Sequence, residues 1–189
     1  MGSIEIPRVL ILYATREGQT EKIAVRIAEH LERYGAKVQL DNARNSALTS
    51  ALNLASFDLL VFGGSMHAGG IEPELVDFIK DRGEQIRQQP RSFFLVLLSA
   101  ATKEPELRKK WLADARAKIH EQLTVSFEEV EMVAGALRYS KYSVPVRWIM
   151  KRIAAKAGEA TDTTKDYEYT DWQQVEAYAR RMFDRLRNS

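Results

Sequence analysis

Short apolar runs alternate along this chain with longer stretches in which apolar residues recur every three to four positions. The short runs are too uniformly hydrophobic for half-exposed strands, and this pattern is typical of strands covered on both faces in a parallel sheet. The longer stretches have the spacing of helices that pack one face on such a sheet. The pattern predicts five strands, at residues 8–13, 36–40, 59–62, 92–99 and about 128–137.

Helical signals fill the segments between these strands. Apolar residues recur at helical spacing over residues 23–31, and Gly35 provides a stop. Pro73 and Pro105 suit the first turns of two further helices. The helix that begins at Pro73 is expected to continue as far as Ile86. Each strand is therefore followed by a segment that can cross back over the sheet.

This alternation predicts an α/β fold, a doubly wound parallel sheet with right-handed crossovers and the strand order 2-1-3-4-5. We expect one domain over residues 8–187, because no internal repeat, linker or low-complexity tract interrupts it. Ligands in such sheets bind beyond the carboxyl ends of the strands, where the strand order switches. Loops rich in small and hydroxyl residues follow the first, third and fourth strands, at 15–20, 65–70 and 99–103.

The first of these loops leads directly from a strand into a helix. A helix N-terminus offers unpaired N–H groups and the positive end of a dipole, so it is a ready anion site. The loop lacks the Gly-Lys-Ser/Thr ending of a nucleotide P-loop and the G-x-G-x-x-G of a dinucleotide site. The hydroxyls of Thr15 and Thr20 can surround a phosphate without a lysine. The alternative is a helix whose threonines only satisfy its own first turn.

Composition excludes several kinds of chemistry. The chain has 189 residues and no cysteine, so disulfides, thiolate nucleophiles, iron–sulfur clusters and Cys-ligated zinc are ruled out. No set of three ligands indicates a metal site. The longest apolar runs are far below the ~20 residues that span a bilayer, and no signal peptide is visible. We therefore expect a cytoplasmic protein.

The net charge of +2 conceals a local basic excess. Residues 138–157 carry six basic residues and no acidic one, which leaves −4 on the rest of the chain. They belong to a segment, residues 138–169, that interrupts the strand–helix alternation and is called the insert below. The final helix follows it, where Thr170 and Gln173 can form a capping box.

The insert contains an amphipathic stretch. On a helical wheel one face holds apolar residues and the other basic residues, with Trp148 among the basic ones; the apolar set is Val146, Ile149, Met150, Ile153 and Ala157. An aromatic residue among cations suits anionic lipid headgroups or an amphipathic ligand. The alternative is a solvated helix that packs its apolar face on the domain. Nucleic acid is not expected, because no helix-turn-helix, RNA-binding aromatic motif or zinc finger is present.

The pattern Thr15-x-x-Gly18-x-Thr20 after the first strand resembles the FMN phosphate loop of flavodoxin-like proteins. The likeness tightens in AGALRY at 134–139 and in TDT at 161–163 followed by YTDW at 169–172. With these motifs the chain resembles, over nearly its whole length, the bacterial menaquinone-dependent protoporphyrinogen IX dehydrogenases, flavodoxin-like enzymes of haem biosynthesis. The resemblance implies a flavodoxin-like fold, FMN as cofactor, and oxidation of protoporphyrinogen IX to protoporphyrin IX with menaquinone or ubiquinone as electron acceptor.

The resemblance also implies roles for individual residues. The FMN phosphate would be held by Thr15, Arg16, Glu17, Gly18, Gln19 and Thr20. The isoalloxazine ring would be flanked by Ser65, Met66, His67, Ala68 and Gly69, and by Ser99, Ala100, Ala101 and Thr102. The second loop lacks the Arg and Tyr expected in the family, so Met66 or His67 is expected to take the place of a stacking aromatic. His67 could instead act in proton transfer, or be a solvent-facing loop histidine.

The substrate's propionates call for cationic partners. Candidate substrate-binding residues are Arg138, Tyr139, Lys141 and Arg147, with the cations acting through charge-assisted hydrogen bonds. Trp148, Lys151 and Arg152 are candidate contacts to the quinone or to the inner-membrane surface, on which the protein would sit peripherally. No catalytic proton acceptor can be assigned from the sequence.

Two other functions remain open at this point. One is a flavodoxin that carries single electrons, although the basic insert and a pI of about 8.8 are unlike an acidic carrier. The other is an NAD(P)H:quinone oxidoreductase, which predicts fast flavin reduction by a nicotinamide.

Overall fold

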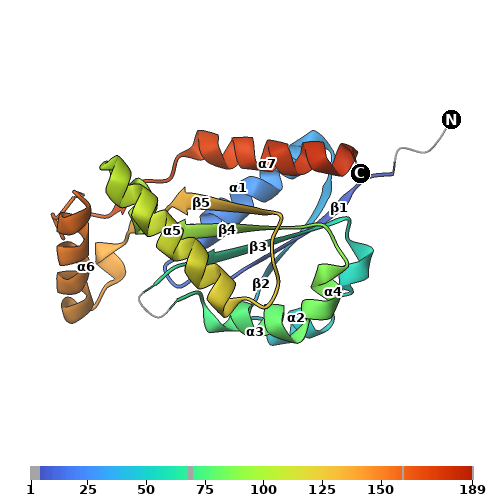
Figure 1. Ribbon diagram of the computed structural model, residues 1–189, viewed down its shortest axis with the longest axis horizontal. Helices are drawn as coiled ribbons and strands as arrows, with labels where there is room; N and C mark the ends of the chain where they lie inside the picture. Colours follow the sequence, from blue (N-terminus) through green and yellow to red (C-terminus); the bar gives the residue numbers. More distant parts are fainter. Residues whose placement is uncertain (1–4, 68–69, 159, 189) are drawn as a thin grey trace.

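A parallel sheet of five strands forms the centre of the computed structural model, which describes residues 5–67, 70–158 and 160–188 (Figure 1). The strand order is β2-β1-β3-β4-β5. This confirms the predicted α/β class and strand order. The strands are β1 (Arg8–Tyr13), β2 (Lys37–Asn42), β3 (Leu59–Ser65), β4 (Arg91–Leu97) and β5 (Glu129–Ala134).

Helices cover both faces of this sheet (Figure 1). One face packs on α1 (Gln19–Tyr34) and α7 (Trp172–Arg187). The other packs on α3 (Pro73–Asp81), α4 (Gly83–Arg87) and α5 (Pro105–Gln122), with the short α2 (Ser46–Ser50) nearby. The run from Val9 to Leu12 in β1 is fully buried because each of its faces has a helical layer against it.

The helix predicted from Pro73 to Ile86 is two helices. The break lies at Arg82, which ends α3 and precedes α4. Its guanidinium donates to the carbonyl oxygen of Leu52 at 2.7 Å, so the side chain is directed toward the segment before β3. The prediction that Ile79 and Ile86 face inward is confirmed, since both are fully buried.

The capping box predicted at Thr170 and Gln173 is not formed. Asp171 caps α7 instead, and its carboxylate accepts from the N–H groups of Gln173 and Gln174. The hydroxyl of Thr170 donates to the carbonyl oxygen of Ala134 at 2.7 Å. Thr170 therefore ties the start of α7 to the end of β5.

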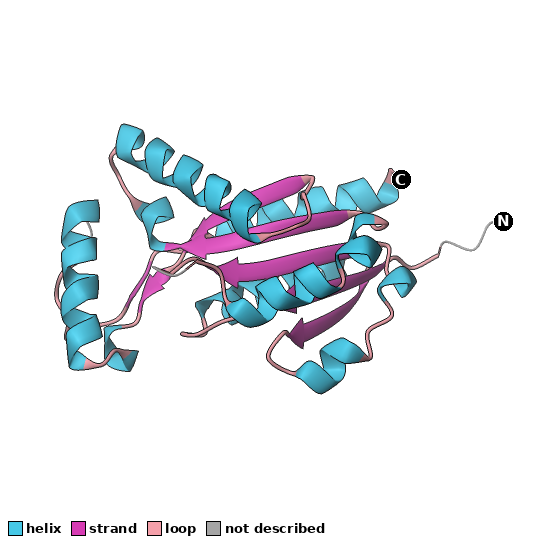
Figure 2. Cartoon of the chain, turned by 60° about the horizontal axis from the view of Figure 1, so that its bottom comes forward, coloured by secondary structure: helices cyan, strands magenta, loops and turns pink. Residues whose placement is uncertain are grey.

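The insert adds a small layer beyond the carboxyl ends of the strands. The strand predicted to reach Leu137 ends at Ala134, and after Gly135 a separate strand β6 (Ala136–Leu137) pairs antiparallel with β7 (Tyr167–Glu168). Between them lie a 3₁₀ turn (Tyr139–Lys141) and α6 (Val144–Ala157). Figure 2 shows α6 standing apart from the sheet, at the end to which the strand arrows point.

The apolar face predicted for α6 is largely exposed. Val146 and Ile149 are 43% and 51% exposed, whereas Ala154 is fully buried and Met150 is half-buried. The side chains of Ile153 and Ala157 lie outside the described residues. These two residues stay uncovered because α6 packs on a small cluster around Leu137 and Tyr139 and does not lie on a face of the sheet. Among the described helices, none has the length and apolarity needed to cross a membrane.

Candidate cofactor site at the carboxyl ends of the strands

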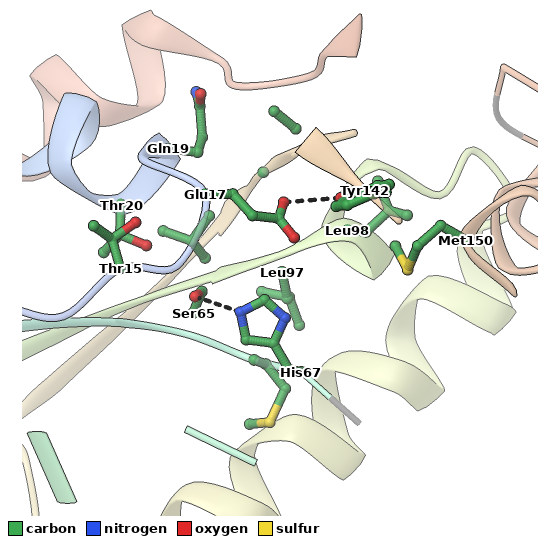
Figure 3. Close-up of a pocket in the computed structure, with 14 residues that line it drawn as sticks. Thr15, Glu17, Gln19, Thr20, Ser65, His67, Leu97, Leu98, Tyr142 and Met150 are labelled. Carbon is green, nitrogen blue, oxygen red and sulfur yellow. Dashed lines mark hydrogen bonds between the residues drawn. The ribbon is translucent and has the colours of Figure 1, made fainter. Parts of the chain in front are cut away.

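A cavity of about 60 Å³ lies where the ends of β1, β3, β4 and β5 meet the insert (Figure 3). The loops after β1 and β3 form much of its wall, as predicted, together with the end of β4. Its lining residues are Thr15, Glu17, Gln19, Thr20, Ser65, Met66, His67, Val96, Leu97, Leu98, Gly135, Ala136, Tyr142 and Met150. Residues from distant parts of the chain thus share one small space.

The loop after β1 places the N-terminus of α1, which has no side-chain cap, at this cavity. Gly18 precedes α1 in the left-handed conformation, with φ of 91°, and no side chain caps the helix. The hydroxyl of Thr15 instead accepts from the N–H of Gly18 at 2.9 Å. Thr20 is almost fully buried in the first turn, and Arg16 is exposed. Thr15 therefore bonds the residue that precedes the helix, and the first turn itself has no side-chain cap.

The insert contacts this loop directly. The hydroxyl of Tyr142 donates to the carboxylate of Glu17 at 2.8 Å, and Lys141 Nζ donates to the carbonyl oxygen of Glu17 at 2.9 Å (Figure 3). Arg138 donates to the side-chain oxygen of Gln19, also at 2.9 Å. Burial and the neighbouring Glu17 carboxylate raise the pKa of Tyr142, so this hydroxyl keeps its proton and remains a donor to the loop.

The loop after β3 contributes a hydrogen-bonded set of side chains. Ser65 and His67 line the cavity, and His67 Nε2 lies 3.0 Å from Ser65 Oγ (Figure 3). Behind them the carboxylate of Glu72 is fully buried and accepts from the N–H of Ser65 at 2.9 Å. His67 is therefore held in the wall by Ser65, with its side chain 27% exposed. Ala68 and Gly69, also predicted for this site, lie outside the described residues.

The loop after β4 is placed differently from its prediction. Val96, Leu97 and Leu98 line the cavity, whereas Ser99, Ala100, Ala101 and Thr102 do not. These four residues turn away into a 3₁₀ turn and its cap. The hydroxyl of Thr102 is buried without a hydrogen-bond partner.

The candidate substrate residues are not gathered at the cavity. Arg138 and Lys141 line a larger groove, of about 780 Å³, that also includes Gly18 and Trp172. Tyr139 is fully buried and its hydroxyl donates to the carbonyl oxygen of Ala160, so it cannot contact a substrate in this structure. Arg138 and Lys141, in the turn before α6, both donate hydrogen bonds to the loop of residues 15–20.

Arg147 also has an internal partner. Its guanidinium donates to the carbonyl oxygen of Tyr142 at 3.3 Å, and its Nε is buried without a partner. The side chain therefore braces the turn that carries Tyr142.

The outer side of α6 carries the other predicted contacts. Trp148 is 59% exposed, and the guanidinium of Arg152 lies 4.9 Å from the centre of its ring. Lys151 is exposed as well, and Val144 at the start of the helix is 77% exposed. Apolar and cationic side chains thus share the surface of α6 that faces away from the sheet.

Sequence reasoning missed several residues of the cavity wall. Gly135 and Ala136 were noticed only as part of AGALRY, yet they line the cavity. Tyr142 and Met150 reach it from the insert. A signal existed for the first pair, because they directly follow the fifth strand at the edge where ligands bind. No sequence signal identified Tyr142, whose role depends on how the insert folds back onto Glu17.

The start of α1 suits the phosphate group of a ligand such as a flavin nucleotide. The free N–H groups at the start of α1 suit an anion, and the left-handed backbone at Gly18 leaves no side chain in the way. The ring end is tighter, since ligand pockets of this kind usually hold about 300–1,000 Å³ and this cavity holds about 60 Å³.

Comparison with known proteins agrees with the fold. A family model described as "Flavodoxin domain" matches residues 10–164. Flavodoxin 2 from Bacillus cereus superimposes with a TM-score of 0.55 at 17% identity, over 94% of this chain and 99% of that one. A flavodoxin from Streptococcus pneumoniae TIGR4 gives a TM-score of 0.51 at 15% identity, with the same coverage of both chains. The chain belongs to the flavodoxin family.

Within that family the similarity is to particular oxidoreductases. The chain is 31% identical over 175 residues to the protoporphyrinogen IX dehydrogenase (quinone) of Escherichia coli strain K12, covering 93% of this chain and 94% of the relative. A protein of the same name from Leishmania major is 29% identical, over 92% of this chain and 73% of that protein. These relationships confirm the resemblance predicted from AGALRY and the other motifs.

Proposed function

We propose that this protein is an FMN-dependent dehydrogenase that oxidises protoporphyrinogen IX to protoporphyrin IX and passes the electrons to a quinone, menaquinone or ubiquinone, in haem biosynthesis. The observation that carries the proposal is an open helix start at a cavity in the strand ends, in a chain related over 93% of its length to enzymes of that name. The flavodoxin family supports a flavin as the cofactor.

Residues at one end of the cavity would bind the phosphate of the cofactor, and residues at the other end would surround its ring. Thr15, Gly18 and Thr20 would bind the phosphate of FMN, and FMN supplies a two-electron acceptor when it is bound. Leu97, Leu98 and Met150 offer an apolar wall that would exclude water from the ring and from an apolar substrate.

The substrate would enter with its carboxylates outward. Arg138 and Lys141 line the groove beside the phosphate loop, where cations can hold propionates by charge-assisted hydrogen bonds. Both cations also hydrogen-bond the loop, so substrate contact there would share donors with the cofactor site. This arrangement places the anchors outside the cavity and leaves its interior for the ring.

An anaerobic assay tests the proposal. The protein is reconstituted with FMN, its absorption spectrum recorded, and porphyrin fluorescence followed from protoporphyrinogen IX with a menaquinone analogue. We expect bound flavin and porphyrin formation that depends on the quinone. Absence of bound flavin after reconstitution would refute the cofactor, and bound flavin without quinone-dependent porphyrin would refute the activity. Stable semiquinone during reductive titration favours an electron carrier, and fast reduction by NADH or NADPH favours a nicotinamide-dependent quinone reductase.

We also propose that the protein works in the cytoplasm while attached peripherally to the inner membrane through α6. Trp148 and Ile149 are exposed beside Lys151 and Arg152, a combination that suits an interface with anionic lipid. Both the substrate and the quinone are apolar, so the outer surface of α6 would bring the site close to them.

Liposome cosedimentation tests this attachment. Replacing Trp148, Lys151 and Arg152 by Ala is expected to lower binding to vesicles containing anionic lipid, because cations near such a surface contribute about 1 kcal/mol each. The matched control replaces Lys109 and Lys110 by Ala, which are exposed on α5, and should change binding much less. Equal binding by all three proteins would remove the role of α6.

A further inference from the structure

Glu72 is a carboxylate with no exposure to solvent, placed directly behind the cavity wall. Burying a charge is costly unless the group is well hydrogen-bonded. Glu72 is bonded by Ser65 twice, because its two oxygens accept from the N–H of Ser65, at 2.9 Å, and from the hydroxyl of the same residue. His67 Nε2 lies 3.5 Å from the carboxylate and 3.0 Å from the Ser65 hydroxyl oxygen.

These contacts decide which nitrogen of His67 carries the proton. The hydroxyl of Ser65 donates to the carboxyl group of Glu72, so its single hydrogen points to Glu72. The Ser65 oxygen must then accept the hydrogen of His67 Nε2. In the neutral imidazole this leaves Nδ1 as an unprotonated base. Among the residues that the structure describes, none makes a hydrogen bond to Nδ1.

We infer that His67 accepts the proton that each dehydrogenation step releases, and that Glu72 acts through Ser65 as the residue that positions it. The inference rests on the proposed function. His67 lines the cavity and faces Glu17 across it (Figure 3). Of the other ionisable side chains that line this cavity, Tyr142 is a donor and Glu17 accepts its hydrogen bond, whereas Nδ1 of His67 has no hydrogen-bond partner among the described residues.

Each dehydrogenation step must place one hydride and one proton, and a flavin with His67 would accept them. Oxidation of one carbon–nitrogen or carbon–carbon unit of the substrate removes a hydride from carbon and a proton from nitrogen or carbon. A bound flavin would supply the acceptor for the electron pair of the hydride, and the proton would go to Nδ1 of His67. The resulting imidazolium is stabilised by the Glu72 carboxylate 3.5 Å from Nε2 and returns its proton to solvent or to the reduced quinone before the next cycle.

Nitrogen NMR of the flavin-free protein gives a test that does not depend on activity. We expect the wild-type His67 ring to be the tautomer protonated at Nε2. In Glu72→Gln the amide oxygen should remain opposite the Ser65 N–H, so the amide NH₂ donates to the Ser65 hydroxyl. Ser65 then donates to Nε2, and the ring should shift toward the tautomer protonated at Nδ1. A wild-type ring protonated at Nδ1 would overturn the inference.

Kinetics of the FMN-loaded protein give the second test. His67→Ala is expected to lower the rate of flavin reduction by protoporphyrinogen IX about 100-fold or more, the usual range for a lost general base, with FMN affinity changed by less than about twofold. Added imidazole should restore part of the rate, which a structural role would not allow. Glu72→Gln should lower kcat about tenfold with KM unchanged, as expected when a general base is held in the wrong tautomer.

The controls separate this inference from the proposed function. His120→Ala, which changes an exposed histidine on α5, should leave the rate unchanged. If His67→Ala folds poorly, His67→Gln keeps a hydrogen bond to Ser65 but cannot take the proton, and it should be as slow. An active wild type with an equally active His67→Gln overturns the inference alone. A wild type that binds FMN and forms no porphyrin overturns the proposed function, and the role of His67 with it.

Discussion

Two helices that lie side by side on one face of the sheet begin in opposite ways. The N-terminus of α7 is closed by its own chain, because Asp171 accepts from two N–H groups of the first turn, at 2.9 and 3.2 Å. The N-terminus of α1 follows Gly18 and has no side-chain cap. Both starts lie at the carboxyl edge of the sheet, and they are linked by a hydrogen bond from the Gln19 amide to Thr170 Oγ1.

The difference separates stability from binding. A capped start is complete within the folded chain and adds to its stability. An uncapped start leaves donors and a positive dipole end for an external anion. Substitutions at Gly18, before α1, and at Asp171, before α7, can therefore measure the effect on ligand binding and the effect on folding stability separately.

The largest effect should come from removing the phosphate of the ligand. Riboflavin is expected to bind at least about 100-fold more weakly than FMN, because the helix start and its charge-assisted hydrogen bonds contribute only to the phosphate. Fluorescence quenching or calorimetry measures both affinities. Asp171→Ala should keep the full ratio, since it opens only α7. Equal affinities for the two flavins would show that the Gly18 loop is not the phosphate site.

A pair of glycines at the two ends of α1 gives the next effect. Gly18 and Gly35 both have positive φ, 91° and 106°, and a side chain in that region costs about 1–2 kcal/mol. Gly18→Ala and Gly35→Ala should therefore lower the free energy of unfolding by similar amounts in urea titrations. Only Gly18→Ala should also weaken FMN binding. A loss of FMN affinity in both variants would mean that α1 as a whole, and not its start, governs the affinity.

Opening the closed helix should have a smaller effect. Asp171→Ala removes the cap of α7 and is expected to cost about 1 kcal/mol of unfolding free energy. FMN affinity should stay within error of the wild type. Asp171→Asn serves as the matched variant, because Asn caps almost as well and should recover most of the loss. If Asp171→Asn is as unstable as Asp171→Ala, the negative charge matters more than the hydrogen bonds.

The smallest effect concerns the hydroxyl that contacts the first turn of α1. Tyr13 donates to Glu21 at 2.9 Å, and burial together with this carboxylate raises the pKa of Tyr13 from 10.0 to about 12. A raised pKa contributes stability that is present below pH 10 and is lost as pH rises toward 12. Tyr13→Phe should therefore show a shallower loss of stability over that window in urea titrations at stepped pH. An unchanged slope would contradict this assignment.

The sequence predicted the sheet well because each strand is buried on both sides. A run such as that from Val9 to Leu12 has no exposed position, so its composition alone reports its place in the fold. The passage from β1 through the loop at 15–18 into α1 was also predictable, since strand, glycine and helix follow each other directly. These signals are local, because each comes from neighbouring residues that form a single strand, loop or helix.

The insert was predicted poorly for the opposite reason. Its helical wheel placed Val146 and Ile149 on one apolar face without fixing what covers that face, and the folded α6 exposes both. Its cations Arg138 and Lys141 were candidates for substrate contact, and the structure adds that both hydrogen-bond the loop of residues 15–20. Partners that are more than a hundred residues apart cannot be found from periodicity or charge, because only the folded chain brings them together.

The contacts between Tyr142, Lys141 and Glu17 have a thermodynamic consequence. They place the phosphate loop and the base of α6 in one hydrogen-bonded unit, so an event at either end can change the free energy of the other. Reciprocity then requires that if lipid bound to α6 raises FMN affinity by some factor, FMN raises lipid affinity by the same factor. The insert would in that case make cofactor loading and membrane attachment a single equilibrium with two ligands.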